Sequence, residues 1–237
     1  LLLKGGKPIN TNRQLASTKA GMEKVTSKWV CKTRSDVIFT HKADFLDFQE
    51  RFKYSKKGIP RLVSGDKIVV SGINTKRFNI KKEYINHVSD WFYFGKSDDI
   101  ELLFCLPLYD PKGLDRNQIL SAEKYIWESF SKKHRDFEDS LSWAESFLVG
   151  NAILINPSAL GLKSLKKGYS FPFGVNGYHG MQHGDWFDLY RAYNNIPQSP
   201  INIKLAVRVI KRRFFQLRHR LCYIPILRIR RYLINNV

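Results

Sequence analysis

The segment from Asn12 to Asp36 passes from a helical pattern to a strand pattern and then to an acid. Apolar residues recur at helical spacing over Asn12 to Ser27, which predicts an amphipathic helix. Trp29–Thr33 is rich in β-branched and aromatic residues of alternating polarity, which predicts a strand that runs into Arg34-Ser35-Asp36. This succession is typical of the carboxyl edge of a parallel α/β sheet, where ligands bind beyond the strand ends. The sequence therefore predicts an α/β fold with a polar site after this strand.

The rest of the chain continues the alternation of helices and strands. Helices are predicted over residues 44–52, 98–103, 121–131 and 140–149, a short helix from Pro157, and strands over 67–70 and 152–155. From Gly168 to Pro200 the periodicity is lost, and glycine, proline, histidine and aromatic residues dominate. This composition predicts an irregular loop region or lid. We expect one domain over residues 1–200.

Charge separates the end of the chain from the rest. The net charge is +19, with 40 basic and 21 acidic residues, and no acidic residue follows Asp188. Residues 203–221 carry one apolar stripe among lysines and arginines, which predicts a basic amphipathic helical tail over 201–237. Such a tail favours binding to an anionic membrane surface. Nucleic-acid binding is less favoured because the tail has more apolar surface than phosphate contacts require, and a tail helix packed on the domain is the third alternative.

The cysteines and the hydropathy of the chain indicate the cellular compartment. Cys31, Cys105 and Cys222 are odd in number and far apart, so neither a disulfide framework nor a metal site is predicted, and a reducing cytoplasm fits. No apolar run reaches the ~20 residues of a membrane span, and no secretory signal is present. The chain opens on Leu1 rather than Met, so we expect a preceding segment. With the tail, this predicts a peripheral protein on the inner face of the cytoplasmic membrane.

The first candidate site lies between residues 12 and 36. Arg13 near a helix start, with Ser17 on the same helix, is suited to holding a diphosphate. Asp36 after the strand is the natural ligand for Mg²⁺ or Mn²⁺ or for a ribose, because hard cations prefer oxygen donors. On spacing alone, a capped helix and a salt bridge between Arg34 and Asp36 are the favoured alternative.

The aromatic run from Ser89 to Gly95 is the second candidate. Aromatic rings such as Trp91 stack on the apolar faces of sugars, and the carboxylate of Asp90 beside it is suited to holding hydroxyls. A buried aromatic strand is the commoner use of such a run. An unpaired buried acid is costly, so burial alone accounts less well for Asp90 than for its aromatic neighbours.

Acids at the starts of two predicted helices form the third candidate. Asp98, Asp99 and Glu123 are candidates for the general base that takes a proton from an acceptor hydroxyl, with Glu123 preferred because it follows a loop. Its alternative role is to stabilise the helix dipole, after a cap at Ser121. His179 and His183 have zinc-like spacing, but the glycines around them oppose a helix there, so we expect no zinc site.

Four runs, in this order and spacing, resemble the WavE lipopolysaccharide synthesis family. They are N-R-Q-L-A-S-T-K-A-G (12–21), K-T-R-S-D (32–36), S-D-W-F-Y-F-G (89–95) and A-E-K-Y-I-W (122–127). The first and third runs are the most specific, and the resemblance covers roughly residues 9 to 165. It implies a fold similar to the GT-A type, an α/β/α sandwich with a nucleotide-sugar pocket. The first strands of such a fold are not apparent, so a nucleotide-binding sheet truncated at its N-terminal side is expected.

The resemblance also implies roles for the candidate residues. Asp36 corresponds to an acid of the D-x-D motif of GT-A enzymes, while Arg34 stands at the first acidic position, which puts dependence on Mg²⁺ or Mn²⁺ in question. The implied donor-binding residues are Arg13, Ser17, Arg34 and Asp36; the catalytic residues are Glu123 and Asp90; the acceptor-binding residues are Trp91 and Asp98.

These observations together predict a glycosyltransferase that moves a sugar from a nucleotide-sugar donor to a lipopolysaccharide or capsular polysaccharide acceptor. Saccharides and lipid-linked saccharides are the expected acceptors. Two alternatives stay open at this stage. One is a non-catalytic basic protein that binds nucleic acid, and the other is a scaffold in a polysaccharide-assembly complex.

Overall fold

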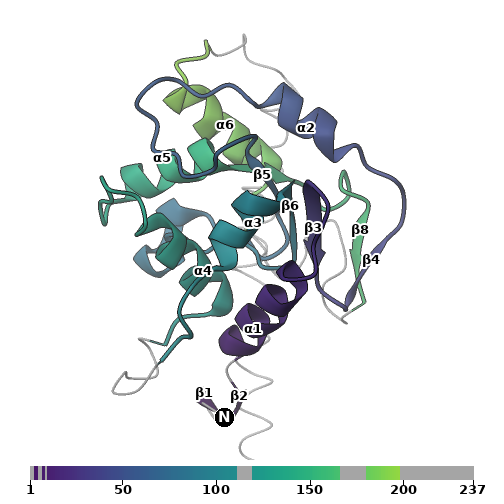
Figure 1. The fold of residues 1–237 in the computed structure, drawn as a ribbon. Coiled ribbons are helices and arrows are strands. Elements are labelled where there is room, and N and C mark those ends of the chain that lie inside the picture. Colours follow the sequence, from purple (N-terminus) through teal and green to yellow (C-terminus); the bar gives the residue numbers. More distant parts are fainter. Residues whose placement is uncertain (1–2, 5–6, 9, 111–118, 166–179, 198–237) are drawn as a thin grey trace, which may run out of the picture. The chain divides into compact units, whose positions relative to one another are not determined.

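A four-stranded mixed sheet lies at the centre of residues 1–195 (Figure 1). Across the sheet the order is β3 (Trp29–Thr33), β6 (Phe92–Lys96), β5 (Ile68–Ser71) and β7 (Ala152–Ile155). Strand β6 is antiparallel to both β3 and β5, while β5 and β7 are parallel. The carboxyl ends of β3, β5 and β7 therefore share one edge of the sheet with the amino end of β6.

The computed structural model describes residues 3–4, 7–8, 10–110, 119–165 and 180–197. The chain divides into residues 1–195 and residues 196–237. The predicted basic tail and His179 lie outside the described residues. Among the residues described, no helix has both the length and the apolar character that crossing a bilayer requires.

The other elements of the first unit are β1 (Leu3–Lys4), β2 (Lys7–Pro8), α1 (Thr11–Met22), β4 (Val37–Phe39), α2 (Phe45–Arg51), η1 (Phe78–Ile80), η2 (Lys82–Tyr84), α3 (Ser97–Phe104), α4 (Ala122–Ser131), α5 (Leu141–Asn151), β8 (Leu162–Ser164) and α6 (His183–Tyr193). Strands β4 and β8 pair antiparallel and form a two-stranded ribbon.

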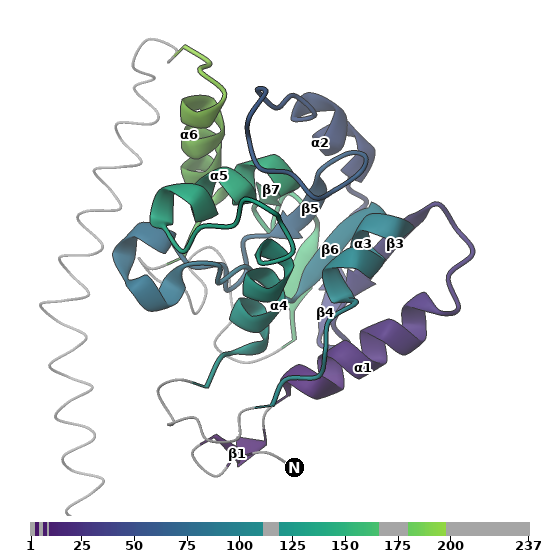
Figure 2. The same ribbon diagram turned by 60° about the vertical axis from the view of Figure 1, so that its left-hand side comes forward.

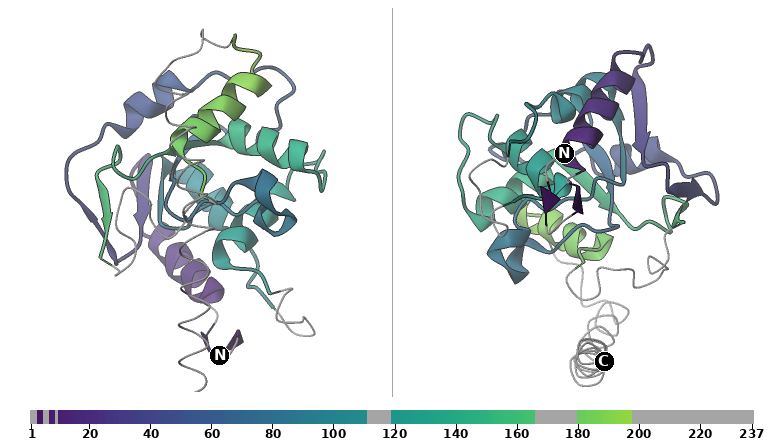
Figure 3. Two further views of the ribbon diagram at one scale, coloured as in Figure 1. Left: turned by 180° about the vertical axis from the view of Figure 1, so that it is seen from behind. Right: turned by 90° about the horizontal axis from the view of Figure 1, so that it is seen from below.

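Side chains of β6 reach both faces of the sheet because successive residues of a strand point in opposite directions. The Tyr93 ring lies 5.4 Å from the Phe104 ring of α3, and its hydroxyl accepts a hydrogen bond from Nε1 of Trp127 in α4 at 3.1 Å. On the other face, Phe94 packs against Phe45 of α2 at 5.0 Å. Figure 2 shows α1, α3 and α4 together on the first face, and the view from behind in Figure 3 looks onto α2 and α6.

Local sequence signals predicted many of these elements. Strands 29–33 and 152–155 are confirmed. The hydroxyl of Ser121 accepts from the amide of Lys124 at 3.3 Å and so caps α4, as expected. Helix α1 ends at Met22, earlier than residue 27, directly after Gly21, a residue that destabilises a helix interior. The α/β class is confirmed.

The predicted parallel neighbour of β3 is wrong, because β3 pairs antiparallel with β6. Alternating polarity identifies a strand but not the direction of its partner. The short helix predicted from Pro157 is also wrong. Gly161 has a φ of +67°, and a Cβ there would collide with the backbone oxygen of His41, so the chain turns and enters β8.

Helix α6 lies where the sequence predicted an irregular loop. Gln182 and Asp185 form a capping box at its start, with the Gln182 amide donating to Asp185 at 2.8 Å. Trp186 and Tyr190, one helical turn apart, are buried. These signals were present in the sequence, but the nearby glycines obscured them.

Lys67 is an unusual core residue at the start of β5. Its side chain is buried, its Nζ donates to the backbone oxygen of Tyr54 at 2.7 Å, and it lies 4.6 Å from the centre of the Tyr190 ring. Burial lowers the pKa of Lys67 to about 7, and the positive charge of Arg61 contributes in the same direction.

We predict that Lys67→Met flattens the pH dependence of stability. The folded pKa is about 7, and a free lysine has a pKa of about 10.4. The unfolded chain therefore binds a proton more tightly between these values, and the wild-type free energy of unfolding rises with pH over this range, by on the order of 2–4 kcal/mol. Urea unfolding at pH 7, 8.5 and 10 measures the slope. The exposed control Lys57→Met should keep it, and a slope retained in Lys67→Met would contradict the assignment.

Candidate functional site

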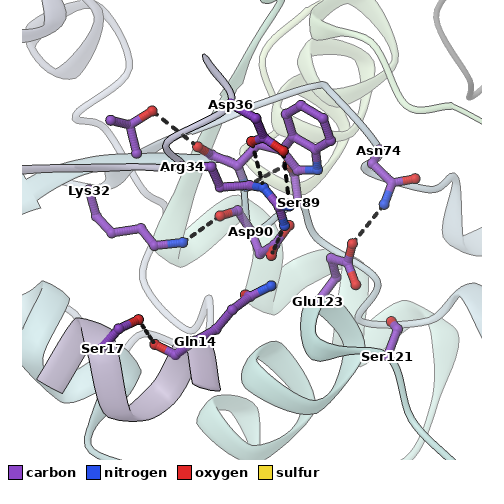
Figure 4. Close-up of polar contacts among 12 residues, drawn as sticks. Gln14, Ser17, Lys32, Arg34, Asp36, Asn74, Ser89, Asp90, Ser121 and Glu123 are labelled. Atoms are coloured by element: carbon purple, nitrogen blue, oxygen red, sulfur yellow. Dashed lines mark hydrogen bonds and ion pairs between the residues drawn. The ribbon is translucent and has the colours of Figure 1, made fainter. Parts of the chain in front are cut away.

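Arg34 joins two carboxylates at the end of β3 (Figure 4). Its Nε and Nη2 lie 3.0 and 3.2 Å from the two oxygens of Asp36, and its Nη1 lies 3.1 Å from Oδ2 of Asp90. The guanidinium carbon also lies 4.9 Å from the centre of the Trp91 ring. The salt bridge between Arg34 and Asp36, which spacing alone favoured, is present. The same guanidinium also forms an ion pair with Asp90, which lies far along the chain.

Two buried hydroxyl groups, those of Thr75 and Ser89, hold the loop that carries Asp90. Thr75 donates to the backbone oxygen of Ser71 at 2.9 Å and accepts from the amide of Ser89 at 3.0 Å. The Ser89 hydroxyl then accepts from the amide of Trp91 at 3.2 Å. Because these hydrogen bonds replace water for buried backbone groups, they fix Asp90 at the amino end of β6.

The carboxylate of Asp90 is enclosed. Its side chain has no exposed surface. Burial, first, and the negative charge of Glu123, second, raise the pKa of Asp90, while Lys32 and Arg34 oppose this shift. Within the described part of the chain its Oδ1 has no hydrogen-bond partner. The cations at Lys32 and Arg34, with a smaller contribution from the Gln14 side chain, therefore compensate this buried acid.

A cavity of about 660 Å³ opens between α1 and β3 beside Arg34. Arg13, Gln14 and Ser17 line it from the helix, and Lys32 and Arg34 line it from the strand side. Its volume is typical of sites for small-molecule ligands. The structure thus brings the predicted donor residues Arg13, Ser17 and Arg34 to one cavity, with Asp36 bound to Arg34.

Lys32 is a site residue that the sequence analysis missed. Its Nζ donates to the backbone oxygen of Asp90 at 2.6 Å and lies over the rings of Tyr93 and Phe104, at 5.6 and 5.4 Å. Burial lowers the pKa of Lys32, and the charge of Asp90 is the largest opposing effect. Strand alternation was the available signal, because it places Lys32 and Arg34 on the same side of the predicted strand.

Glu123 lies in the first turn of α4, at the same edge of the sheet. The Asn74 side chain, on the loop after β5, donates to Oε1 of Glu123 at 2.7 Å (Figure 4). Asn74 has a φ of 59°, a backbone conformation that asparagine adopts more readily than most residues. The charge of Glu123 acts on both Asp90 and Lys32. Two loops and a helix start therefore converge near Asp90 and Lys32, and Lys32 lines the cavity.

Comparison with known protein families identifies the chain. Residues 3–131, from β1 to the end of α4, match the family described as WavE lipopolysaccharide synthesis. The chain belongs to the WavE lipopolysaccharide synthesis family. This membership confirms the resemblance and indicates involvement in lipopolysaccharide synthesis. Neither a curated protein nor a solved structure matches this WavE chain.

Two predicted acceptor residues of the WavE chain are not placed as expected. Asp98 lies in the first turn of α3, after the carboxyl end of β6, whereas Asp90 precedes its amino end. The two acids are therefore at opposite edges of the sheet, and we leave Asp98 out of the candidate site. Trp91 is only 3% exposed and Arg34 lies over its ring, so its position supports the arginine and leaves little surface for a sugar. Asp99 is buried and accepts from the Ser64 amide at 2.7 Å, also away from the cavity.

The described residues do not fit a divalent ion at Asp36. Both of its oxygens accept hydrogen bonds from Arg34, so a cation stands where a second oxygen ligand would be needed. Among the described residues, no three His, Cys, Asp or Glu side chains gather as a metal site. His183 directs its Nδ1 at the backbone oxygen of Leu154, 2.6 Å away, and stacks on Trp186, which suits a packing role. A metal requirement stays a prediction.

We predict that Arg34→Ala destabilises the fold in a pH-dependent way. Removing one partner of a buried ion pair leaves the Asp90 charge uncompensated, at a cost on the order of 2–4 kcal/mol. A carboxyl group whose pKa is raised in the folded state destabilises the fold once it loses its proton. The loss of stability in Arg34→Ala should therefore grow as pH rises from 5 to 8. Urea unfolding at both pH values measures it.

A matched control separates this effect from the loss of any salt bridge. Arg51→Ala breaks an exposed pair with Asp47 and should cost less than about 1 kcal/mol at either pH. Adding Asp90→Asn to Arg34→Ala should remove the pH dependence. A loss for Arg34→Ala that is equal at pH 5 and pH 8 would count against a buried charge at Asp90.

Proposed function

We propose that this WavE-family chain is a glycosyltransferase that transfers a sugar from a nucleotide-sugar donor to a lipopolysaccharide or capsular polysaccharide acceptor. One observation carries the proposal: a cavity lined by cationic side chains lies beside two carboxylates, Asp90 and Glu123, at the edge of an α/β sheet. The cavity runs along β3 from Val30 and reaches past the carboxyl end of that strand to Arg34 and Ser35, and the carboxyl ends of strands are where ligands of such sheets bind. A fold of the GT-A type, an α/β/α sandwich, is part of this proposal.

The cations that face the cavity support binding of a diphosphate. Arg34 is already held by two carboxylates, so Arg13 and Lys32 are the cationic lining residues left for a ligand. Arg13 is exposed near the start of α1, where the helix dipole favours negative charge. The Lys32 ammonium has three donors, and among the described residues one of them is used, in a hydrogen bond to the backbone oxygen of Asp90. Charge that develops on the leaving diphosphate would be stabilised by these two side chains.

The two carboxylates suit different roles. Glu123 is partly exposed, and Asn74 orients one of its oxygens. It is the better placed of the two to take the proton of an acceptor hydroxyl as that oxygen bonds to the anomeric carbon and the bond to the diphosphate breaks. Asp90 is enclosed, so it acts by positioning Arg34 and Lys32.

A scaffolding role is the second candidate. The engagement of both Asp36 oxygens by Arg34 favours it, because the position corresponding to the D-x-D motif is closed by an internal ion pair. Such a protein would bind a nucleotide sugar without turning it over. The basic tail is proposed to hold either form of the protein at an anionic membrane surface.

We predict that Lys32→Met weakens nucleotide binding at least about tenfold, the loss expected for one charge-assisted hydrogen bond. Isothermal titration of UDP, GDP and CMP against the full chain identifies the nucleotide and then measures the variant. Arg13→Met should behave similarly. Lys28→Met is the matched control, since Lys28 is exposed and lies directly before the amino end of β3, away from Arg34. If none of the three nucleotides binds, or if Lys32→Met binds like the wild type, the assignment of the donor site is wrong.

We predict that Glu123→Gln lowers kcat about 10²- to 10³-fold with little change in donor KM, because it removes a proton acceptor and keeps the shape of the side chain. The assay measures release of nucleoside diphosphate from the nucleotide sugar that binds, with lipopolysaccharide as acceptor. Glu128→Gln, on the same helix and bound to Lys132, should leave kcat unchanged. Donor binding without any turnover by the wild type would favour the scaffold instead.

A further inference from the structure

Exposed apolar side chains gather on the β4–β8 ribbon and on α2. Ile38, Phe39, Leu46 and Leu165 are 40%, 47%, 50% and 60% exposed. They belong to neighbouring segments, because Phe39 contacts Phe45 of α2 at 6.4 Å and β4 pairs with β8. Single exposed apolar residues are ordinary, but a group on adjacent elements marks an interaction surface.

The register of the ribbon places two of these residues, Ile38 and Leu165, on one face, whereas Phe39 lies on the other face with Val37. Ile38 lies opposite Lys163, and the amide of Leu165 donates to the backbone oxygen of Asp36 at 2.9 Å, which continues the ladder. Since neighbours in a strand alternate, Asp36, Ile38, Lys163 and Leu165 share what we call the outer face of the ribbon. The residue between the first two, Val37, points inward and is 8% exposed.

The outer face adjoins the candidate site. Leu165 lies directly across the ladder from Asp36, the residue that holds Arg34. Arg34 in turn lines the cavity between α1 and β3. A largely exposed leucine is therefore a near neighbour of the polar groups proposed to bind the donor. If an acceptor is attached to a larger carrier, that carrier would contact the ribbon when the acceptor reaches this site.

The charge of the outer face indicates what it contacts. Lys163 is exposed, opposite Ile38 and two residues before Leu165. The negative charge of Asp36 on this face is compensated by Arg34. A surface that combines apolar side chains with an exposed lysine is complementary to anionic lipid, since the apolar groups enter the headgroup region and the cation remains at its phosphates.

We propose that the outer face of the β4–β8 ribbon docks on an anionic lipid bilayer and presents the site to an acceptor embedded in that bilayer. The second half of this statement rests on the proposed function. The first half does not, and it is separate from binding by the tail because it concerns residues of the first unit. The lipid is recognised by its negative headgroups and its acyl chains together.

Fluorescence at single positions tests the contact in the full chain, tail included. Cys31, Cys105 and Cys222 are replaced by serine, and Leu165→Cys or Ile38→Cys is labelled with an environment-sensitive fluorophore. With vesicles of phosphatidylcholine and phosphatidylglycerol, emission should shift to the blue and rise at least about twofold as the label leaves water. Leu141→Cys is the matched control, since Leu141 is also exposed and α5 lies across the molecule from the ribbon in Figure 1.

Vesicle partitioning gives the second measurement. Leu165→Asp and Ile38→Asp should each lower the partition coefficient about five- to tenfold, through lost apolar contact and added repulsion, while Leu141→Asp should leave it unchanged. A silent label on protein that sediments with vesicles would overturn the proposal, because binding would then lie elsewhere. An equal response to vesicles of phosphatidylcholine alone, or a response without lipid that grows with protein concentration, would also overturn it.

Nucleotide titration of the same variants keeps this proposal distinct from the proposed function. Intact nucleotide binding with no response to lipid would contradict the ribbon contact alone. A lipid response in a chain that binds none of UDP, GDP or CMP would support the contact and contradict the donor site.

Discussion

The enclosed carboxylate of Asp90 is the constraint on which the sheet edge depends. A buried charge is tolerated only when opposite charges and hydrogen bonds compensate it. Here the compensation comes from Lys32 and Arg34, which the antiparallel register of β3 and β6 brings alongside. Arg34 then also holds Asp36, immediately before β4. One ion-pair network thus connects the cavity, the sheet and the ribbon.

Local sequence patterns were sufficient for elements that short-range physics determines. The strand at 29–33 follows from alternation, and the start of α4 follows from a side-chain cap at Ser121. Pairing was beyond such patterns, because the antiparallel partner of β3 lies about sixty residues further along the chain and nothing local encodes its direction. Gly161 shows a third limit, since its turn depends on a close approach to the backbone of His41.

For the candidate site too, the sequence predicted what neighbouring segments determine and missed what distant segments determine. Arg13, Ser17, Arg34 and Asp36 were expected to lie together, and they do, because a helix and the next strand are neighbours in space. Asp98 stands at the start of a helix, as expected, but that helix follows the carboxyl end of β6, whereas Asp90 precedes its amino end, and the sequence does not show this separation. Lys32 was overlooked because a lysine within a strand is usually solvated, and only the position of Asp90 shows otherwise.

Charge balance also determines which groups remain for a ligand. Arg34 is shared between Asp36 and Asp90, so it cannot offer a full positive charge to a phosphate without weakening one of them. Lys32 and Arg13 are different, because the first directs one donor at a backbone oxygen and the second is exposed on α1. An anion in the cavity would favour the positive charge of buried Lys32, whose pKa burial lowers. Binding of a diphosphate and retention of that charge would therefore reinforce one another, which gives this edge of the sheet a physical preference for anionic ligands.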